Sequence, residues 1–308
     1  MSDTFANTAQ LTDQWRTQGY LILPGVIDAD RMAQLSSLCL PAFENWAQTS
    51  ATDGEPGGWH YKPDGFVMLH LNHPRHHQHQ RDRLPVLLDT IADVRVLNLL
   101  QQIFGSEPLF NQNTMYYDPP EQARQSSWHR DSQFFCDDGD DATLKKLIAA
   151  EAAPPRELHM HIPLLPTAHT QLVPGSHDRW DTPEEHHIRT QNSGSDDMPN
   201  ALTVKLSPGD LAFFHVNALH RGLYPVGQTR RTISVTYSHP QNPRPADAAL
   251  MKKWQGYVAS YQPWSAAPDY LAGTAPTTRA FFNRFVQTYQ SSWQPNYLDP
   301  LPGFACLF

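Results

Sequence analysis

A histidine and an aspartate stand two positions apart in the segment Trp128-His129-Arg130-Asp131. Residues 128–135 predict a β-strand, on which side chains at positions i and i+2 point to the same face. His129 and Asp131 would then offer one imidazole and one carboxylate to a single ion. By itself this short pattern fits a surface salt bridge equally well, so other residues must decide.

Two further histidines follow a tight turn in the second half of the chain. The turn is predicted by Pro208-Gly-Asp210, and the apolar run after it predicts a strand at residues 211–215. This strand leads to His215 and then to His220. Neutral imidazole is the commonest metal ligand in proteins, so these rings are candidates to join the first pair.

A strand with a basic and polar face is predicted next, at residues 231–237. Arg230, Thr232 and Ser234 alternate with apolar residues and therefore share one face. A guanidinium fork and two hydroxyls suit a small dicarboxylate, although an ordinary amphipathic strand would look the same. Two imidazoles, one carboxylate and this arginine together fit the facial triad of non-haem Fe(II) oxygenases, which leaves positions open for cosubstrate and O₂.

The elements that must hold these residues change character near Gly105. Before it, apolar side chains recur at helical spacing, and helices are predicted at residues 9–19, 28–46 and 84–104. After it, short runs separated by Pro- and Gly-containing turns predict strands, among them residues 109–117, 158–165, 171–173 and 201–206. This pattern is typical of a β-sandwich, jelly roll or barrel, here mainly β with flanking helices.

We expect a single domain over residues 1–308, with a mainly helical N-terminal part (1–105), a jelly-roll core (106–240) and a C-terminal extension (241–308). The chain has a formal net charge of −8 and scattered basic residues, which argues against nucleic-acid binding. No apolar run is long enough to span a membrane, and no signal peptide is recognisable. A cytoplasmic location is therefore expected, and the oligomeric state stays open.

Five motifs, in their order and spacing, resemble the phytanoyl-CoA dioxygenase family of Fe(II)/2-oxoglutarate-dependent oxygenases. They are Gly19-Tyr-Leu-Ile-Leu-Pro-Gly25, Trp128-His-Arg-Asp131, Val173-Pro-Gly-Ser-His177, Gly209-Asp210 with His215 and His220, and Arg230-Arg-Thr-Ile-Ser234. The resemblance covers about residues 9–240 and implies a double-stranded β-helix, the cupin-like jelly roll. One departure is the stretch 168–172, which lacks the Asn-Gly usual in the family.

The resemblance also assigns residues to the site. His129, Asp131 and His220 match the ligands of Fe(II), whereas His215 matches a family histidine that is usually not a ligand. Arg230 matches the arginine that pairs with the far carboxylate of 2-oxoglutarate, with Thr232 and Ser234 beside it. Three side chains of the strand at 109–117 resemble those directed at cosubstrate and substrate: Gln112, Thr114 and Tyr116.

The implied reaction is hydroxylation of an unactivated C–H bond of a small molecule, driven by decarboxylation of 2-oxoglutarate with O₂. Related halogenases have a small residue where Asp131 stands, so the carboxylate favours hydroxylation, desaturation or ring closure. No basic cluster awaits the phosphates of coenzyme A, and the residues around His129 do not match ectoine hydroxylases. A natural-product intermediate or an amino-acid derivative is the expected substrate. A cupin-like metal isomerase or hydrolase and a non-catalytic ligand-binding protein are the alternatives.

Other histidines and aromatic residues carry weaker expectations. His159 and His161 share a face of one predicted strand and are expected to fill space, with His161 the one that could touch substrate. A dense cluster is expected to form a solvated loop, or else a lid or an adventitious metal site: His70, His73, His76, His77 and His79. Several aromatic residues would pack in the core or cap the barrel mouth: Trp59, Tyr61, Phe66, Trp254, Tyr257, Tyr261 and Trp264.

Overall fold

The computed structural model describes residues 4–52, 67–117, 124–125, 127–137, 139–243 and 262–293. Its helices are α1 (Thr8–Gln18), α2 (Ala29–Thr52), α3 (Leu84–Ile91), α4 (Val94–Phe104), α5 (Asp141–Glu151), α6 (Pro183–Gln191) and α8 (Pro276–Tyr289). Its strands are β1 (Tyr20–Leu23), β2 (Val67–Leu69), β3 (Leu109–Tyr117), β4 (Arg124–Gln125), β5 (Glu157–Pro163), β6 (Thr167–Leu172), β7 (Leu202–Leu206), β8 (Leu211–His215), β9 (His220–Tyr224) and β10 (Arg231–Ser238).

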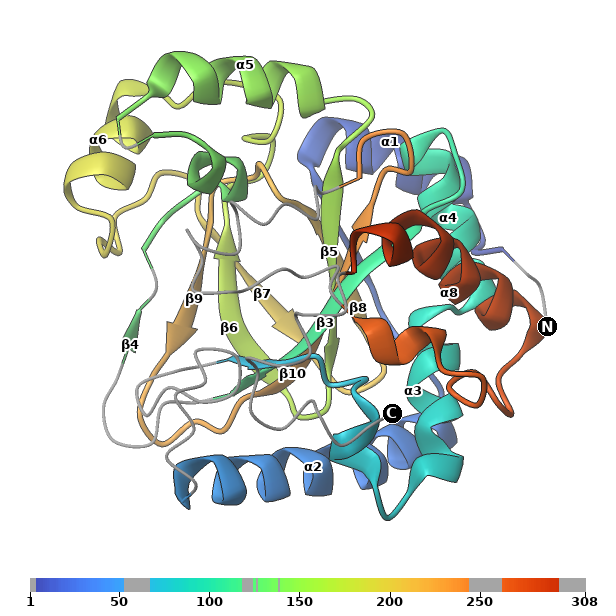
Figure 1. Cartoon of the computed structure of the whole chain (residues 1–308). Coiled ribbons are helices and arrows are strands. Elements are labelled where there is room, and N and C mark those ends of the chain that lie inside the picture. The colour runs from blue at the N-terminus through green and yellow to red at the C-terminus, as the bar shows by residue number, and fades with distance from the viewer. Residues whose placement is uncertain are drawn as a thin grey trace.

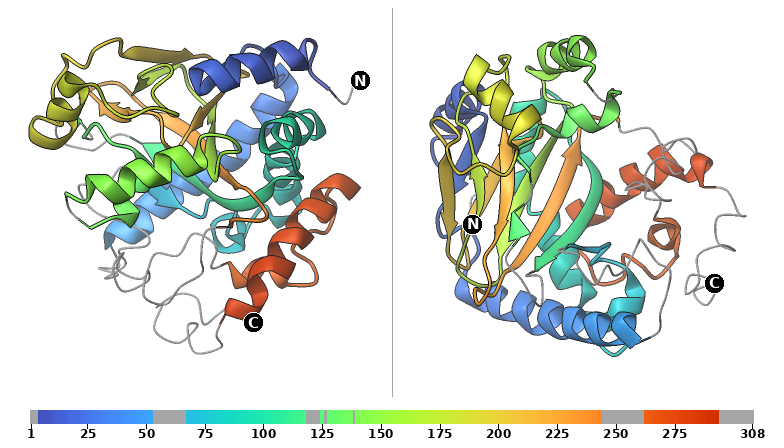
Figure 2. Two further views of the ribbon diagram at one scale, coloured as in Figure 1. Left: turned by 90° about the horizontal axis from the view of Figure 1, so that it is seen from above. Right: turned by 90° about the vertical axis from the view of Figure 1, so that its left-hand side faces the viewer.

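The strands form two antiparallel sheets that face each other. The larger sheet has the order β1-β8-β5-β10-β3-β2, and the smaller has the order β4-β9-β6-β7. Figures 1 and 2 show the two layers side by side, with helices α4 and α8 on the outer side of the larger sheet and α2 along one end. The expected fold class, mainly β in a jelly roll with flanking helices, is confirmed.

The alternation of side chains on β10 sets the character of the two faces of the larger sheet. Ile233 and Val235 are fully buried in the apolar core shared with the helices. Thr232, Ser234 and Thr236 point the other way, into the space between the sheets. The neighbouring strand β5 follows the same alternation, and so does β3 except that its outward-facing Asn113 is polar. The larger sheet therefore has a polar inner face and a mainly apolar outer face.

Two local predictions are wrong. Residues 128–135 are not a strand, because a single bridge at His129 is followed at once by a 3₁₀ helix, η3 (Asp131–Phe135). The helix predicted at 84–104 is two helices, since Asp93 caps α4 by accepting a hydrogen bond from the backbone N–H of Arg95 at 2.9 Å. Helices α5 and α6 were not predicted.

The histidine cluster is also not the solvated loop that its sequence predicts. His70, His73 and His77 are buried, and the rings of His70 and His73 lie 5.2 and 4.1 Å from that of Trp264. The Nε2 of His77 lies 2.7 Å from the carbonyl oxygen of Leu71. These three rings are therefore part of the buried interior, and two of them pack against Trp264, which is far away in the sequence. The other aromatic residues expected to cap the site lie outside the described residues: Trp59, Tyr61, Phe66, Trp254, Tyr257 and Tyr261.

Candidate metal centre

Three side chains converge at one end of the space between the sheets. The Nε2 atoms of His129 and His220 lie 3.4 and 3.5 Å from Oδ1 of Asp131. All three donor atoms lie within 4.8 Å of one another, close enough for one metal ion. The side chains are only 17, 10 and 20% exposed for His129, His220 and Asp131, so the cluster is largely shielded from water.

The backbone joins the two histidines directly. The N–H of each donates to the carbonyl oxygen of the other at 3.0 Å, which makes an isolated antiparallel bridge at the start of β9. The N–H of Asp131 donates to the carbonyl of Val216 at 2.9 Å. His129 and Asp131 thus reach the same place as predicted, although a bridge and a 3₁₀ turn position them instead of an extended strand.

The hydrogen bonds of the histidines fix their protonation pattern. The Nδ1 of His129 lies 2.6 Å from the carbonyl oxygen of Ser127, and that of His220 lies 2.8 Å from the carbonyl oxygen of Ala218. A carbonyl only accepts, so each Nδ1 carries a proton, and in the neutral ring each Nε2 is left with the lone pair that a metal ion would bind. Two imidazoles and a carboxylate oxygen that converge in this way are a donor set suited to an Fe(II) or Zn(II) ion.

The electrostatics of Asp131 and His220 agree with this. Burial would raise the pKa of Asp131, but His220 and hydrogen bonds with His129 and His159 outweigh it and hold that pKa well below its usual range. Burial and the charge of His129 lower the pKa of His220 to about 3. Burial also lowers the pKa of His129, but its contact with Asp131 raises it overall. The carboxylate is therefore ionised and His220 neutral, as metal ligation requires.

Arg130, which lies between His129 and Asp131 in the sequence, is buried and connects distant segments of the chain. The sequence analysis did not predict this role. The guanidinium of Arg130 donates to Asp181 Oδ1 at 2.6 and 3.0 Å and to the carbonyl of Ser176 at 2.6 Å. It also donates to the carbonyl of Asn217. The arginine thereby joins the Pro-Gly-Ser-His loop to the turn that delivers His220. No local pattern marks it, since its partners are remote in sequence.

Arg230 lies buried just before β10. Its guanidinium carbon is 4.7 and 5.1 Å from the ring centroids of Tyr116 and Tyr224. Its N–H groups reach the hydroxyls of Thr170 and Thr232 at 3.3 and 3.5 Å. A buried cation among hydroxyls and aromatic faces is a suitable carboxylate receptor.

The other predicted cosubstrate residues line the same inner face. Thr232, Ser234 and Thr236 pair in register with Tyr116, Thr114 and Gln112 of β3. The Nε2 of Gln112 is directed at the hydroxyl of Thr236, 3.4 Å away. The five predicted residues, together with Thr236, which was not predicted, therefore lie on adjacent strands.

His159 and His161 of β5 face the same space. The Nε2 of His159 lies 2.7 Å from Oδ2 of Asp131, a contact that the sequence analysis did not predict. His161 lies beside Phe214 and Tyr116, with ring centroids 4.9 and 5.8 Å away. Burial, and then the charge of Arg230, hold the pKa of His161 well below its usual value, so this ring is neutral.

His215 is not part of the cluster, as expected. Its Nε2 donates to the carbonyl of Glu151 at 2.9 Å, and its Nδ1 accepts from the N–H of Asn217 at 2.9 Å. Burial, with the charge of His177, lowers its pKa to about 3. This ring is a neutral structural element that orients the turn before His220.

We expect acid to destabilise the protein through His215. Because its pKa is about 3 in the folded chain, the ring contributes stability above the unfolded value near 6.5 and loses it as pH falls, by about 1.4 kcal/mol per pH unit. His215→Asn keeps an acceptor near the Nδ1 position and should flatten the fall in unfolding free energy between about pH 6.5 and 5. Urea titrations across this range measure it, and an unchanged slope would contradict the assignment.

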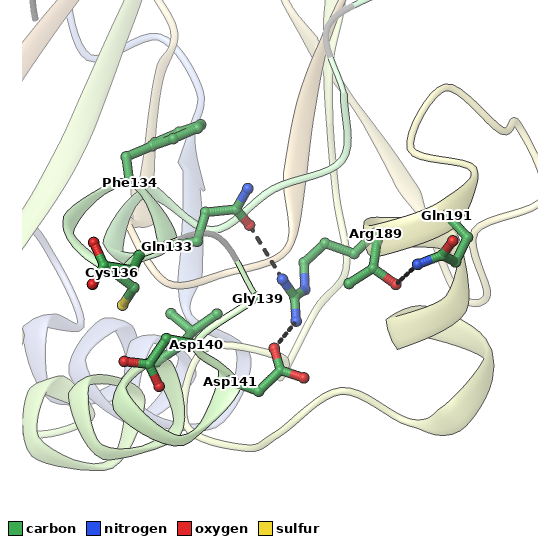
Figure 3. A pocket seen from close by; sticks show the side chains of 11 residues that line it. Gln133, Phe134, Cys136, Gly139, Asp140, Asp141, Arg189 and Gln191 are labelled. Atoms are coloured by element: carbon green, nitrogen blue, oxygen red, sulfur yellow. Dashed lines mark hydrogen bonds and ion pairs between the residues drawn. The ribbon is translucent and has the colours of Figure 1, made fainter. Parts of the chain in front are cut away.

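A pocket of about 480 Å³ lies between η3, α5 and α6 (Figure 3). Gln133 and Asp141 reach Arg189 across it, both at 3.5 Å. Phe134 also lines this pocket, and the centroid of its ring is 5.3 Å from that of His129. The 3₁₀ turn therefore stands between this polar pocket and the metal cluster, which does not line it.

Comparison with known proteins identifies the family. The family model described as phytanoyl-CoA dioxygenase (PhyH) matches residues 15–232. The chain belongs to the phytanoyl-CoA dioxygenase family. This confirms the family expected from the five motifs and, with the His-Asp-His cluster, the enzyme class: a 2-oxoglutarate-dependent oxygenase that uses Fe(II) and O₂. Among the described residues, no helix is both long and apolar enough to cross a membrane.

Individual relatives of this phytanoyl-CoA dioxygenase family member are distant. The ectoine dioxygenase of Stutzerimonas stutzeri (strain A1501) is 23% identical over 283 residues, which cover 85% of this chain and 87% of the relative. AviO1 from Streptomyces viridochromogenes Tue57 has a TM-score of 0.54 and 18% identity over 78% of this chain and 99% of its own. EctD from S. alaskensis, solved with 2-oxoglutarate and 5-hydroxyectoine, has a TM-score of 0.53 and 19% identity over 78% and 84%. The two structures share the fold of this chain.

Proposed function

We propose that this oxygenase hydroxylates an unactivated C–H bond of a small molecule, a natural-product intermediate or an amino-acid derivative. The convergence of two Nε2 lone pairs on the Asp131 carboxylate carries this proposal. Family membership supports it, and so does the carboxylate itself, which occupies the position that halogenation would need open. The cytoplasmic location and the single-domain organisation over residues 1–308 stay predictions.

The proposed roles follow from the contacts. His129, Asp131 and His220 would hold Fe(II), which supplies redox chemistry that couples cosubstrate decarboxylation to oxidation of a C–H bond. The carbonyls of Ser127 and Ala218 hold both imidazoles with Nε2 directed inward. Burial of the cluster keeps water from it and protects the bound reactants from side reactions.

Arg230 would bind the far carboxylate of 2-oxoglutarate through a charge-assisted fork. Thr232 lies within reach of the guanidinium and orients it, and the aromatic faces of Tyr116 and Tyr224 keep it desolvated. Ser234 and Thr114 line the same face beyond it. Desolvation strengthens the carboxylate interaction, since the effective dielectric constant of the site is low.

The proposed reaction is tested by tracing oxygen. With Fe(II), 2-oxoglutarate and a library of small metabolites, we expect succinate release coupled to a product that gains one oxygen atom from labelled O₂. Loss of two hydrogens without oxygen gain would instead indicate desaturation or ring closure. Turnover under strict anaerobiosis without 2-oxoglutarate would contradict the proposal in favour of a metal isomerase or hydrolase. A chain that forms no anaerobic charge-transfer band with Fe(II) and 2-oxoglutarate would be a non-catalytic ligand-binding protein.

Arg230→Ala should lower kcat/KM for 2-oxoglutarate by about 100-fold, because a buried charge-assisted pair contributes on the order of 3 kcal/mol. Arg231→Met is the matched control. The guanidinium carbon of Arg231 lies 4.2 Å from the ring centroid of Phe43, and this guanidinium donates a hydrogen bond to a backbone carbonyl. Initial rates at varied 2-oxoglutarate measure both. An effect of Arg231→Met as large as that of Arg230→Ala would refute the role of Arg230.

A further inference from the structure

A third imidazole approaches the metal-binding carboxylate from the side away from the cluster. His159 lies on β5, and its Nε2 is 2.7 Å from Oδ2 of Asp131. The other carboxylate oxygen, Oδ1, is the one that faces Nε2 of His129 and His220. The two oxygens of Asp131 therefore have different partners, one a single imidazole and the other the metal position.

The partners of Nε2 and Nδ1 determine which of these two nitrogens of His159 donates a hydrogen bond and which accepts one. Its Nδ1 lies 3.0 Å from the hydroxyl oxygen of Thr236. An ionised carboxylate only accepts, so Nε2 of His159 donates to Asp131. In the neutral ring Nδ1 must then accept, and the hydroxyl of Thr236 donates to it. The Nε2 of Gln112 in turn donates to that hydroxyl oxygen at 3.4 Å.

The pairing of strands in the larger sheet brings the hydrogen-bonding side chains of Gln112, Thr236 and His159 together. Thr236 of β10 pairs in register with Gln112 of β3 on one side and with His159 of β5 on the other. The three strands are neighbours in the larger sheet (Figure 1), and the three side chains share its inner face. The register of the strands thus brings the polar atoms of the three side chains within hydrogen-bonding reach of one another.

We propose that His159 is a positioning residue that restricts Asp131 to metal coordination through one oxygen, with Thr236 and Gln112 fixing the donor nitrogen. This inference deepens the proposed function and rests on it. While Oδ2 is engaged by His159, the carboxylate cannot turn to chelate the ion with both oxygens. One further coordination position is thereby left for cosubstrate or O₂. Gln112 thus acts on the metal centre indirectly.

The test measures binding of Co(II) alone at neutral pH, together with its visible spectrum. His159→Leu removes the donor and should weaken Co(II) binding by about 10- to 100-fold, with a changed spectrum as Oδ2 becomes a ligand. His159→Gln keeps an N–H donor and should restore affinity to within about threefold of the unsubstituted chain. If His159→Leu bound Co(II) as tightly as the unsubstituted chain, the proposal would be overturned. Equal losses of affinity in His159→Leu and His159→Gln would also overturn it, because the imidazole itself would then be a ligand.

His161→Leu is the matched control, because His161 lies two residues along the same strand on the same face. Its Co(II) affinity should equal that of the unsubstituted chain, and a loss equal to that of His159→Leu would overturn the specific role. If His159→Leu fails to fold, Thr236→Val removes the hydroxyl with little change of shape. It should weaken Co(II) binding severalfold, and unchanged binding would count against the proposal.

The same titration separates this inference from the proposed function. If the unsubstituted chain binds no Co(II), or if His129→Ala binds it equally well, the metal site itself is wrong. If the unsubstituted chain binds Co(II) and His129→Ala does not, while His159→Leu binds normally, only the role of His159 is overturned.

Discussion

Asp131→Ala is expected to reduce substrate-coupled succinate formation by more than about 1,000-fold, the largest effect among the single substitutions considered. The reason is electrostatic as well as geometric. Asp131 is the only anionic member of the cluster, and its pKa is held well below the usual range so that it is ionised at neutral pH. Without it, two neutral imidazoles remain, and the cluster loses both a ligand and the negative charge that balances a divalent ion.

Three companion variants make the Asp131 result specific. Asp131→Asn keeps the shape but removes the charge, so it should lose nearly as much activity and metal affinity as Asp131→Ala. Asp131→Glu keeps the charge but displaces the oxygens, and should retain part of the metal affinity. Asp82→Asn, at an exposed carboxylate in the turn before α3, should behave as the unsubstituted chain. Succinate release and Fe(II) titration measure all four, and normal metal binding by Asp131→Ala would refute the metal centre.

Arg130→Met is expected to destabilise the fold by about 2 to 4 kcal/mol, because it removes one of the two guanidinium partners of the buried Asp181, which keeps Arg189 at 2.6 Å. Arg130 and Asp181 are both inaccessible to solvent and lie 2.6 Å apart. The carbonyls of Ser176 and Asn217 would also lose their donor in the interior. Since whole domains are stable by about 5–15 kcal/mol, such a loss should be evident in expression level and melting temperature.

Urea unfolding of Arg130→Met checks this expectation. Arg16→Met is the control, since Arg16 pairs with Asp13 at 2.5 Å on the surface and both side chains are mostly exposed. Surface pairs contribute about 0–1 kcal/mol, so the control should unfold almost as the unsubstituted chain does. Equal losses in the two variants would show that the Arg130 network is not a major stabilising feature.

Sequence reasoning succeeded where the pattern is local. The alternation on β10 was predicted correctly, because a period of two in polarity is enough to sort Thr232 and Ser234 from Ile233 and Val235. The convergence of His129, Asp131 and His220 was expected through the family resemblance. Spacing alone does not show which distant histidine lies beside His129 and Asp131.

The sequence-based predictions failed where contacts with residues far away in the sequence determine the local structure. Residues 128–135 hold a bridge and η3 in place of the predicted strand, and the side chain of Arg130 within them is held by Asp181 and Asn217, which lie far along the chain. His159 reaches Asp131 because β5 pairs with β8, and Val216 directly after β8 accepts a hydrogen bond from Asp131. The order of strands in a sheet cannot be predicted from the local pattern of polar and apolar residues. The buried histidines near residue 70 pack on Trp264, whose position no nearby residue indicates.

The backbone bridge between His129 and His220 has a consequence for how the protein acquires its ion. Bringing together two segments so far apart in sequence costs chain entropy, and here sheet formation compensates for that cost. An arriving ion therefore meets ligands that are already assembled, and none of its binding energy goes into ordering the chain. In zinc fingers, by contrast, metal uptake and folding are one event. We therefore expect this scaffold to exchange its ion without unfolding.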